Sequence, residues 1–523
     1  MMTAVNDQHT ELHAKEHAIE PEDDAMLVSL ASMGQPRAQA AIWDRYAPLV
    51  RAIVRRSIAQ ESDVDDLVQE VFLRFYRNIR HLRSPEALRS FIFAISFRVT
   101  ISELRSRRSR RWLRLGDSNS VMAQGGMQIS VAPEDSPVTH FVDTLKGGHM
   151  QNDHQLLKVM VEEGPSIAKW LLSLGVLFDR DGDGNLHVKK GGGSSKPRLL
   201  TCSDYTGLEI MRVLKDEVLN QNIQLLEFCA AIELTSDEKG NCTGAILKDL
   251  DNQRLIVVAA KSVILATGGI GRLHIQGFPT SNHYGATGDG LCLAYRLGAK
   301  LMHIDTFQYH PSGAVYPEQL IGALVTEGIR SEGGHLVNAQ GERFVNEMDT
   351  RDVVSSSIIR ECEEGRGIRT MSGRIGVWLD TPLLDVEHGT GTLEKHFPAM
   401  MMQFDRFGID ISKDPVLIYP TLHYQNGGVK IDTNSETNVH NLFVAGEASG
   451  GLHGRNRLMG NSLLDLMVFG KRSGLTAGSR AAAMPQGKLT VGHVKGFRAE
   501  AKKHGNVSGI VSPMILPAYT RKE

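Results

Sequence analysis

The stretch HGRNRLMGNSLLDLMVF, residues 453–469, decides the fold of this chain. It joins a turn rich in Arg and Gly to an apolar helix, which either Asn461 or Ser462 is placed to cap. Gly460 lets another backbone come close to the turn. A helix N-terminus with cations beside it favours a carboxylate, a phosphate or the electron-rich end of a flavin. Two arginines of the turn offer guanidinium groups to such an anion: Arg455 and Arg457.

The overall composition is that of an ordinary globular protein. Of the 523 residues, 41% are hydrophobic and 23% are charged, which allows about two to four domains. The five scattered cysteines form no CxxC pair, which argues against a disulfide framework or a Cys-bound iron–sulfur cluster. No apolar run is long enough to span a bilayer. We therefore expect a cytoplasmic protein without a transmembrane segment, held at a membrane only through a partner.

The amino-acid usage changes near residue 115. Residues 1–115 contain 17 Arg and one Lys, whereas residues 116–523 contain 20 of each. Gly is rare in the first part and abundant in the second. The change indicates two parts with different histories.

The first part has the spacing of helices. A polar, acidic tail at residues 1–22 precedes runs of helical periodicity at 23–57, 63–78 and 85–104. The middle run, DVDDLVQEVFLRFYRN, has Asp63 as an N-cap candidate and a single apolar stripe. These features predict a small all-α domain.

The third helical run combines aromatic and basic residues. Phe91, Phe93 and Phe97 fit a helix core as well as they fit stacking on unpaired bases. The run ends in an Arg cluster, which is either a solvated linker or a set of phosphate contacts. Its candidate nucleic-acid-binding residues are Arg105, Arg107, Arg108, Arg110 and Arg111.

The sequence DLVQEVFLRFYRNI at 66–79, with the FIFAISFRV helix and the Arg-rich end, resembles region 2 of bacterial sigma factors. The resemblance covers residues 23–115 and is strongest to the extracytoplasmic-function group. It implies that the DLVQEVF helix docks on the RNA polymerase core and that the next helix opens promoter DNA. A full sigma factor also needs a C-terminal helix-turn-helix, and no such pattern is evident after residue 115.

From His140 onward the sequence has the pattern of an α/β protein. KSVILATGG, at 261–269, predicts a buried strand that ends in a turn of small residues. Before it we expect helices at 155–174 and 204–220 and strands at 224–228, 243–247 and 255–259.

This second part resembles the flavoproteins of the succinate dehydrogenase, fumarate reductase and L-aspartate oxidase family, over about residues 139–480. The family's order is kept by HFVDTLKGG, SDYTGLEIM, SVILATGG, ATGDG, FQYHPSG, LVTEGIRSEGG, GERFVNE, TRDVVSSSI, HYQNGG, LFVAGEASGGLHG and NRLMGNSLLDL. The resemblance implies hydride transfer between FAD and a C4 dicarboxylate such as fumarate or succinate. Electrons would come from a separate electron-transfer subunit or donor.

The resemblance also implies which residues bind the dicarboxylate. They are His310, Thr326, His423 and Arg457. Arg suits a carboxylate because its planar fork makes two parallel hydrogen bonds. A lone His is more often structural, but two His beside Pro and Gly turns, with an Arg in its own motif, favour a binding site.

Proton transfer would fall to Arg351, as in the family. An ordinary Arg is a poor acid because its pKa exceeds about 12, so a relay must restore its proton. Glu327 and Arg330 match the family's relay, and their i, i+3 spacing places them on one face if that segment is helical. Without the motif, a solvated ion pair is the simpler interpretation.

FAD binding would involve Thr267, Gly268, Asp289, Glu447, Ser462 and Leu463. The family opens with a strand, a GxGxxG turn and a helix that grip the FAD pyrophosphate. No GxGxxG follows any expected strand here, and GGIGRL at 268–273 does not fit that pattern. The family's early His-containing segment, which can hold flavin covalently, is not found either. We therefore expect exposed apolar sheet edges and a severely reduced FAD affinity.

The sequence thus predicts a multidomain protein: an all-α sigma region 2-like bundle, then an α/β (α+β) FAD-binding domain without its GxGxxG unit and with an inserted capping domain. The expected segments are a tail at 1–22, a helical domain at 23–115, a linker at 116–138, FAD-binding parts at 139–302 and 421–480, a capping domain at 303–420 and a truncated segment at 481–523. Three interpretations stay open: a flavin oxidoreductase, a sigma-like transcription protein, and an inactive product of joined genes.

Overall fold

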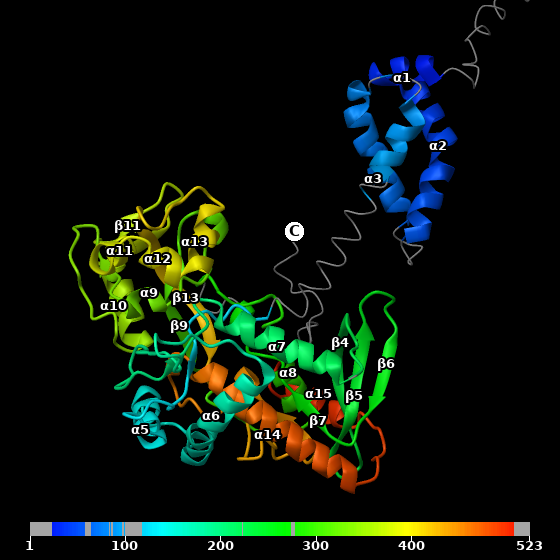
Figure 1. Cartoon of the computed structure of the whole chain (residues 1–523). Coiled ribbons are helices and arrows are strands. Elements are labelled where there is room, and N and C mark those ends of the chain that lie inside the picture. The colour runs from blue at the N-terminus through cyan, green and yellow to red at the C-terminus, as the bar shows by residue number, and fades with distance from the viewer. Residues whose placement is uncertain are drawn as a thin grey trace, which may run out of the picture. The chain divides into compact units, whose positions relative to one another are not determined.

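The computed structural model describes residues 24–57, 64–82, 84, 87–96, 99, 118–221, 223–273 and 278–506. The chain separates into two compact units, Met1–Leu115 and Gly116–Glu523, and each is described by itself (Figure 1). The expected tail at 1–22, the N-cap candidate Asp63, Phe97 and the arginines between 105 and 111 lie outside the described residues.

The first unit is helical, as predicted. It contains α1 (Asp24–Ser32), α2 (Pro36–Ser57), α3 (Val64–Asn78), the 3-10 turn η2 (Ile79–His81) and helical residues at 88–96. The first predicted run divides into α1 and α2 because Gly34 turns the chain with a φ of 80°. The helices share one apolar core, which includes Ile42, Val50, Val68, Phe72, Phe75 and Ile92.

The aromatic residues of this unit divide between core and surface. The rings of Trp43 and Phe72 lie 4.5 Å apart, and Phe91 packs edge-on against Phe75 at 6.1 Å. Phe93, by contrast, is 50% exposed. Phe91 is therefore a core residue, whereas Phe93 lies on the surface.

The second unit mixes helices with short strands. Its helices are α5 (Pro137–Gly147), α6 (His154–Leu174), α7 (Thr206–Asn220), α8 (Asp289–Arg296), α9 (Gly328–Ser331), α10 (Arg351–Glu363), α11 (Leu383–His388), α12 (Thr392–His396), α13 (Pro398–Asp405), α14 (Asn461–Ala483) and α15 (His493–Lys503). Within the described ranges, every helix is too short or too polar to cross a membrane.

The strands of this unit form several small sheets. They are β1 (Met127–Gln128), β2 (Val188–Lys189), β3 (Leu199–Leu200), β4 (Cys229–Ser236), β5 (Cys242–Asp249), β6 (Leu255–Ala259), β7 (Val263–Leu265), β8 (Leu301–Met302), β9 (Phe307–Ala314), β10 (His335–Val337), β11 (Ile368–Arg369), β12 (Ile375–Asp380), β13 (Val416–Gln425), β14 (Gly428–Lys430), β15 (Leu442–Val444) and β16 (Ser449–Gly450). The 3-10 turns η4 (Gly271–Leu273), η6 (Glu318–Leu320) and η7 (Gly446–Ala448) belong to the same unit.

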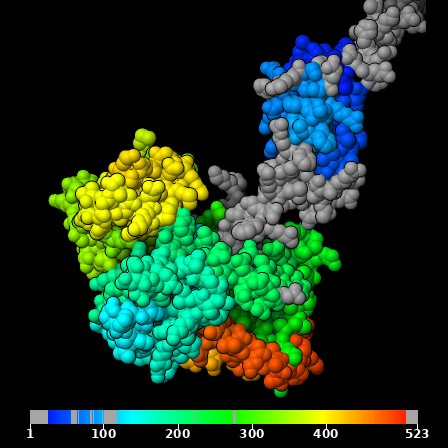
Figure 2. Space-filling view, viewed as in Figure 1, coloured from blue at the N-terminus to red at the C-terminus, as the bar shows by residue number. Residues whose placement is uncertain are grey.

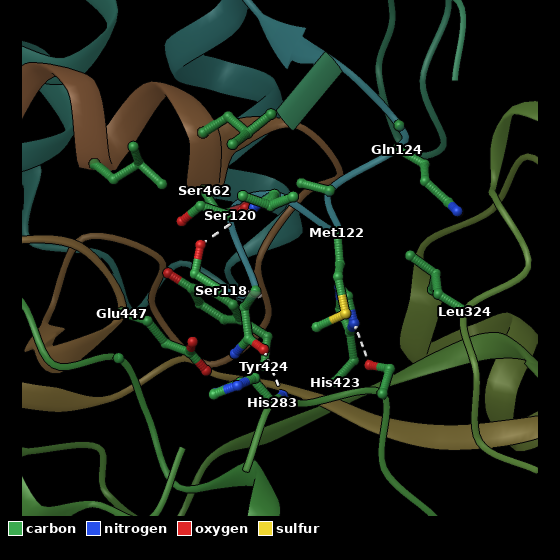
Figure 3. A pocket seen from close by; sticks show the side chains of 18 of the residues that line it. Ser118, Ser120, Met122, Gln124, His283, Leu324, His423, Tyr424, Glu447 and Ser462 are labelled. Atoms are coloured by element: carbon green, nitrogen blue, oxygen red, sulfur yellow. Dashed lines mark hydrogen bonds between the residues drawn. The ribbon is translucent and has the colours of Figure 1, made fainter. Parts of the chain in front are cut away.

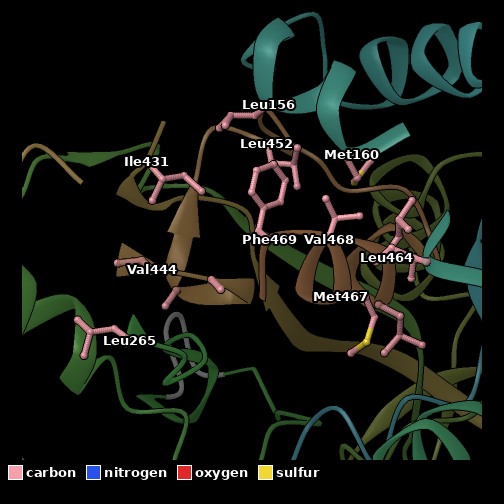
Figure 4. Close-up of a cluster of buried hydrophobic side chains, with 14 of the residues drawn as sticks. Leu156, Met160, Leu265, Ile431, Val444, Leu452, Leu464, Met467, Val468 and Phe469 are labelled. Atoms are coloured by element: carbon pink, nitrogen blue, oxygen red, sulfur yellow. The ribbon is translucent and has the colours of Figure 1, made fainter. Parts of the chain in front are cut away.

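Helix α14 is the centre of the main core. Its apolar face packs against α6 and β15, as Figure 4 shows for the residues around Phe469. The predicted apolar stripe is buried at Leu464, Met467, Val468 and Phe469. The capping prediction is wrong, because Gly460 occupies the N-cap position with a φ of 79°. The Asn461 side chain is instead bonded to His140 and Thr144.

A second core lies under the sheet β10–β12–β13–β9. All neighbouring strands in this sheet are antiparallel. Helices α9–α13 cover it, with Leu336, Ile358, Val377, Leu393 and Phe404 among the residues between them. The sheet and its helices form a layer beside the main core (Figure 1). Within the sheet, β9 and β13 are neighbouring strands.

The segment expected as a linker at 116–138 is instead part of the second unit. Met127 and Ile129 are fully buried in its core, and β1 pairs with β3. Asp135 binds the buried Arg198 through two contacts of 2.8 and 2.9 Å, and Asp143 of α5 binds it at 2.7 Å. The linker prediction is therefore wrong, because the composition of this segment did not reveal these buried partners.

Two strand predictions also differ from the structure. Residues 224–228 form no strand, and β4 begins at Cys229. The expected buried strand at 261–269 is only β7, which pairs with β15 in a parallel, two-stranded sheet. Ile264, in the middle of β7, is 40% exposed, and among the described strands only β15 pairs with β7.

Candidate active site

A cavity of about 660 Å³ lies in the second unit. One end is lined from β9, β13 and the first turn of α10, and the other from the turns that follow β7 and β15 and precede α14. Figure 3 shows side chains from these elements around the cavity. The lining includes most of the predicted site residues: Thr267, Gly268, His310, Thr326, Glu327, Arg351, His423, Glu447, Arg457, Ser462 and Leu463.

Two buried histidines lie side by side at the first end, which we call the cationic end. His310 on β9 and His423 on β13 have ring centroids 5.1 Å apart. The Nδ1 of His310 accepts the Ser312 N–H, so its remaining proton lies on Nε2 when the ring is neutral. Burial, with Arg351 nearby, lowers the pKa of both histidines well below 6.5. They therefore serve as neutral hydrogen-bond donors near pH 7.

The guanidinium of Arg457 is held from several sides. It donates to Ser462 Oγ at 3.1 Å and to Gln308 Oε1 at 3.1 Å, and it lies 4.5 Å from the Tyr424 ring centroid. Its Nε is buried without a hydrogen-bond partner among the described residues. Burial, reinforced by repulsion from Arg351, lowers the pKa of Arg457 to about 9. The group is thus oriented and still lacks a partner for one donor.

Arg351 and Glu327 form a direct pair in the same end. The Arg351 Nε donates to Glu327 Oε2 at 2.7 Å, and its Nη1 donates to Gln308 at 3.1 Å. Arg330 does not line the cavity, but its Nη2 lies 3.5 Å from the same Glu327 oxygen. The three residues therefore form a continuous line from the cavity into the protein.

Burial and the neighbouring charges set the pKa values of Glu327 and Arg330. Burial alone would raise the pKa of Glu327, but Arg351 and Arg330 outweigh that effect and hold it below 4.5. Burial is also the main reason that the pKa of Arg330 is lowered. The cationic end and the residues behind it thus contain three buried guanidinium groups, those of Arg330, Arg351 and Arg457, and one buried carboxylate, that of Glu327. Their net charge is two positive charges.

The second end of the cavity, which we call the open end, has glycine turns and one buried acid. Gly268 and Gly446 have positive φ values of 71° and 70°, which bring the turns after β7 and β15 close to the cavity. Glu447 accepts the Gln425 N–H at 3.0 Å. Burial raises the pKa of Glu447 to about 7. Ser462 and Leu463 lie in the first turn of α14, whose dipole favours negative charge.

These residues fit the isoalloxazine and ribityl part of a flavin. A cradle of glycine turns, a buried acceptor and a helix N-terminus meet at one end of the cavity. Elsewhere in the cavity lining, Gln124 Oε1 is buried without a described partner. Asp289 is the exception among the predicted FAD residues, because it does not line the cavity. Its carboxylate accepts the Thr287 hydroxyl at 2.6 Å at the start of α8.

The sequence interpretation missed one wall of the cavity, residues 118–126. Asn119 donates to Asn282 and accepts the His283 N–H, both at 2.7 Å, and Ala123 O accepts the Gly207 N–H. Figure 3 shows Ser118, Ser120 and Met122 of this wall. Gln308 was missed as well, although it lies two residues before His310 and so shares its face of β9.

Comparison with known proteins agrees with both units. The family described as FAD binding domain matches residues 114–463, and the family described as Sigma-70 region 2 matches residues 42–110. A fumarate reductase (CoM/CoB) polypeptide of Methanothermobacter marburgensis is 41% identical over 369 residues, which are 69% of this chain and 65% of that protein. An L-aspartate oxidase of Nicotiana tabacum is 35% identical over 68% of this chain and 56% of that protein.

Solved structures give the same relationship. A quinol fumarate reductase of E. coli superposes with a TM-score of 0.66 at 30% identity, over 74% of this chain and 67% of that chain. Mycobacterium smegmatis Sdh1 superposes with a TM-score of 0.59 at 35% identity, over 75% of this chain and 66% of that chain. The chain spans less than two thirds of the length of the curated relatives named above. It belongs to the FAD-binding flavoprotein family of fumarate reductase and succinate dehydrogenase, and it carries a sigma-70 region 2 ahead of that domain.

Proposed function

We propose that the second unit transfers hydride between FAD and a C4 dicarboxylate, with Arg351 as the proton donor. The observation that carries the proposal is the 2.7 Å contact of Arg351 with Glu327 inside a cationic cavity. FAD, when bound, supplies the hydride acceptor or donor. Thr267, Gly268, Glu447, Ser462 and Leu463 would hold its isoalloxazine and ribityl part.

The cationic end suits a dianion. Two positive charges in a buried site match two carboxylates, and the neutral His310 and His423 add donors without adding charge. Thr326 and Arg457 would complete the carboxylate contacts. Together these groups fix both ends of the substrate and leave its central carbons between Arg351 and the open end.

Proton transfer by an Arg needs a path that restores the proton. Arg351 lines the cavity, and its Nε donates to Glu327 Oε2 at 2.7 Å. Glu327 would return a proton to Arg351 and receive one from Arg330, whose lowered pKa eases that step. The role of a relay explains why a fully buried carboxylate lies between two guanidiniums.

The charges favour an unsubstituted dicarboxylate over aspartate. Among the described residues, the carboxylates that line the cavity are Asp204, Glu327 and Glu447, and all three accept hydrogen bonds from the protein. The ammonium group of aspartate would therefore lie near guanidinium groups, and each described carboxylate of the cavity is already engaged by the protein. Electrons would arrive from a separate subunit or a diffusible donor.

One purification tests the proposal. The full chain is incubated with excess FAD and desalted, then assayed for flavin absorbance and for fumarate-dependent oxidation of a reduced viologen dye. We expect retained flavin and turnover with fumarate that exceeds turnover with L-aspartate. Because the sequence lacks GxGxxG, retention should need high FAD concentrations. Failure to bind flavin under any condition would contradict an active enzyme.

The first unit supports a second candidate function, polymerase binding. It matches Sigma-70 region 2, and Phe93 lies on its surface. We propose that this unit binds the RNA polymerase core and promoter DNA. Co-purification of the chain with core polymerase tests this, and an unchanged elution position of both proteins would contradict it.

A further inference from the structure

A row of hydrogen-bonded side chains runs from the cationic end to the surface of the second unit. It starts at Gln308 of β9, whose Oε1 accepts Arg351 Nη1 and Arg457 Nη2, each at 3.1 Å. Gln308 Nε2 donates to Asn456 Oδ1 at 2.8 Å. Asn456 Nδ2 donates in turn to Asp352 Oδ1 at 2.9 Å. The two arginines of the proposed chemistry are therefore connected to Asp352 through two buried amides.

The row reaches the surface at the turn after α5. Asp352 Oδ2 lies 3.2 Å from His149 Nε2, and the His149 side chain is 53% exposed. His149 and Met150 have positive φ values of 57° and 60°, a conformation that residues other than Gly rarely adopt. This turn follows α5, which Figure 2 shows in cyan at the surface of the second unit. The row thus joins four elements that are far apart in the sequence: α5, β9, α10 and the turn before α14.

Gln308 supplies the two arginines with an acceptor that carries no charge. Arg351 and Arg457 repel each other, and this repulsion contributes to the lowered pKa of Arg457. A carboxylate in the place of the Gln308 amide would also hold both guanidiniums, but it would cancel one of the positive charges that a dianion needs. The amide oxygen holds both groups, and the cationic end keeps its net positive charge.

The Gln308 amide can perform this role in only one orientation. If the amide were turned over, its NH2 group would face two guanidiniums, which are donors without acceptors. Two acceptors hold the NH2 group on the other side, Asn456 Oδ1 at 2.8 Å and Arg457 O at 2.6 Å. The Asn456 amide is fixed in the same way, because its Nδ2 donates to Asp352 Oδ1 and to Gly147 O. Carboxylate and carbonyl oxygens only accept, so they set the direction of every hydrogen bond in the row.

We propose that Asn456 and Asp352 are positioning residues, which act through Gln308 to hold Arg351 and Arg457 at the separation that a C4 dicarboxylate needs. The lining of the cavity includes both arginines but not Gln308, Asn456 or Asp352, so these three residues act behind the site. The two amides neither gain nor lose a proton near neutral pH, so the row orients groups and does not conduct protons. The proposal rests on the proposed function of the two arginines.

Calorimetric titration of the full chain with succinate tests the positioning. Asn456→Ser shortens the side chain, so that it no longer bridges Gln308 and Asp352. Asn338→Ser is the matched control, because Asn338 is also buried and hydrogen-bonded but lies in the turn after β10. We expect at least about tenfold weaker succinate binding for Asn456→Ser and less than about a twofold change for Asn338→Ser. Equal succinate affinities of the two variants would overturn the proposal.

A second measurement needs neither FAD nor succinate. NMR of the full chain with isotope-labelled arginine gives the Nε–H signals of Arg351 and Arg457, which are identified by their loss in Arg351→Lys and Arg457→Lys. We expect both signals to shift in Asn456→Ser, because the orientation of their common acceptor is released, and to stay in place in Asn338→Ser. Unshifted signals in Asn456→Ser would overturn the proposal, whatever the activity of the chain. Shifted signals in a chain that does not reduce fumarate would support it and contradict the proposed function alone.

Discussion

The two ends of the cavity are built in opposite ways. At the cationic end, Arg351, Arg457 and Glu327 are almost completely buried, and side chains from β9, α10 and the turn before α14 hold them. At the open end, Ala266 and Thr267 are exposed, and the described sheet behind them stops at two strands. If the two ends have the proposed roles, the chemistry of this site and the binding of its cofactor depend on separate parts of the fold.

The largest expected effect concerns the cationic end. In the FAD-loaded chain, Arg351→Gln should lower fumarate turnover by roughly a thousandfold, because it removes the proposed proton donor. Succinate binding should change less, since Arg457 remains. The measurement is kcat and KM with a reduced viologen dye. Arg360→Gln, an exposed position of the same helix, is the control. Equal kcat values for the two variants would exclude Arg351 as the donor.

The next effect concerns the acid of the open end. The pKa of Glu447 is raised from 4.5 to about 7 in the folded chain, so the folded state binds its proton more tightly than the unfolded state. The contribution of Glu447 to stability without FAD should therefore fall by about 3 kcal/mol as the pH rises from about 4.5 to 7, against the opposite contribution of the neutral His310 and His423. Glu447→Gln should remove this contribution from the pH profile of urea unfolding, whereas the exposed Glu394→Gln should keep it. Parallel pH profiles for the two variants would contradict the raised pKa.

A smaller effect separates the two arginines of the turn. Arg457→Lys keeps a positive charge but loses the planar fork, so succinate binding should weaken by about tenfold. Arg455→Lys should have little effect, because Arg455 is half exposed and pairs with Asp305 at 2.7 Å. Binding to the wild-type chain should also decline as the pH passes about 9, where Arg457 loses its proton. Calorimetry from pH 7 upward measures both effects; equal losses in the two variants would contradict the assignment.

The smallest expected effect tests whether the Ile264 side chain of β7, at the open end, is exposed in solution. Ile264→Ala should cost less than about 1 kcal/mol, because that side chain is partly exposed on an incomplete sheet. The neighbouring Leu265→Ala should cost about 2–5 kcal/mol, because Leu265 is buried in the main core. Urea unfolding of the full chain compares them. Similar losses would mean that Ile264 is covered in solution.

The sequence predicted the cationic end better than the open end. His310, His423 and Arg457 lie far apart in the chain, and their ordered motifs placed them in one site correctly because the resemblance contains long-range information. Residues 118–126 and Ile264 were misjudged for a physical reason. A loop composed of small polar residues has no periodicity to reveal a buried wall, and an apolar strand does not show whether its neighbour exists.

Local chemistry also explains the capping error at α14. Asn461 is a good N-cap by type, yet its amide is used by His140 and Thr144, which approach from α5. Gly460 takes the cap position because Leu199 and Gln128 leave no room there for a side chain. Such competition between tertiary partners is invisible to a single stretch of sequence.

The buried Arg198 determines where this protein can be cut. It is neutralised by Asp135 and Asp143, and removing one partner of a buried ion pair typically costs about 3–5 kcal/mol. An expression boundary at residue 139, where the expected FAD-binding part begins, would delete Asp135 together with the wall at 118–126. A boundary at residue 116 retains both. The ion triad and the wall at 118–126 therefore together set the minimal fragment that keeps the cavity intact.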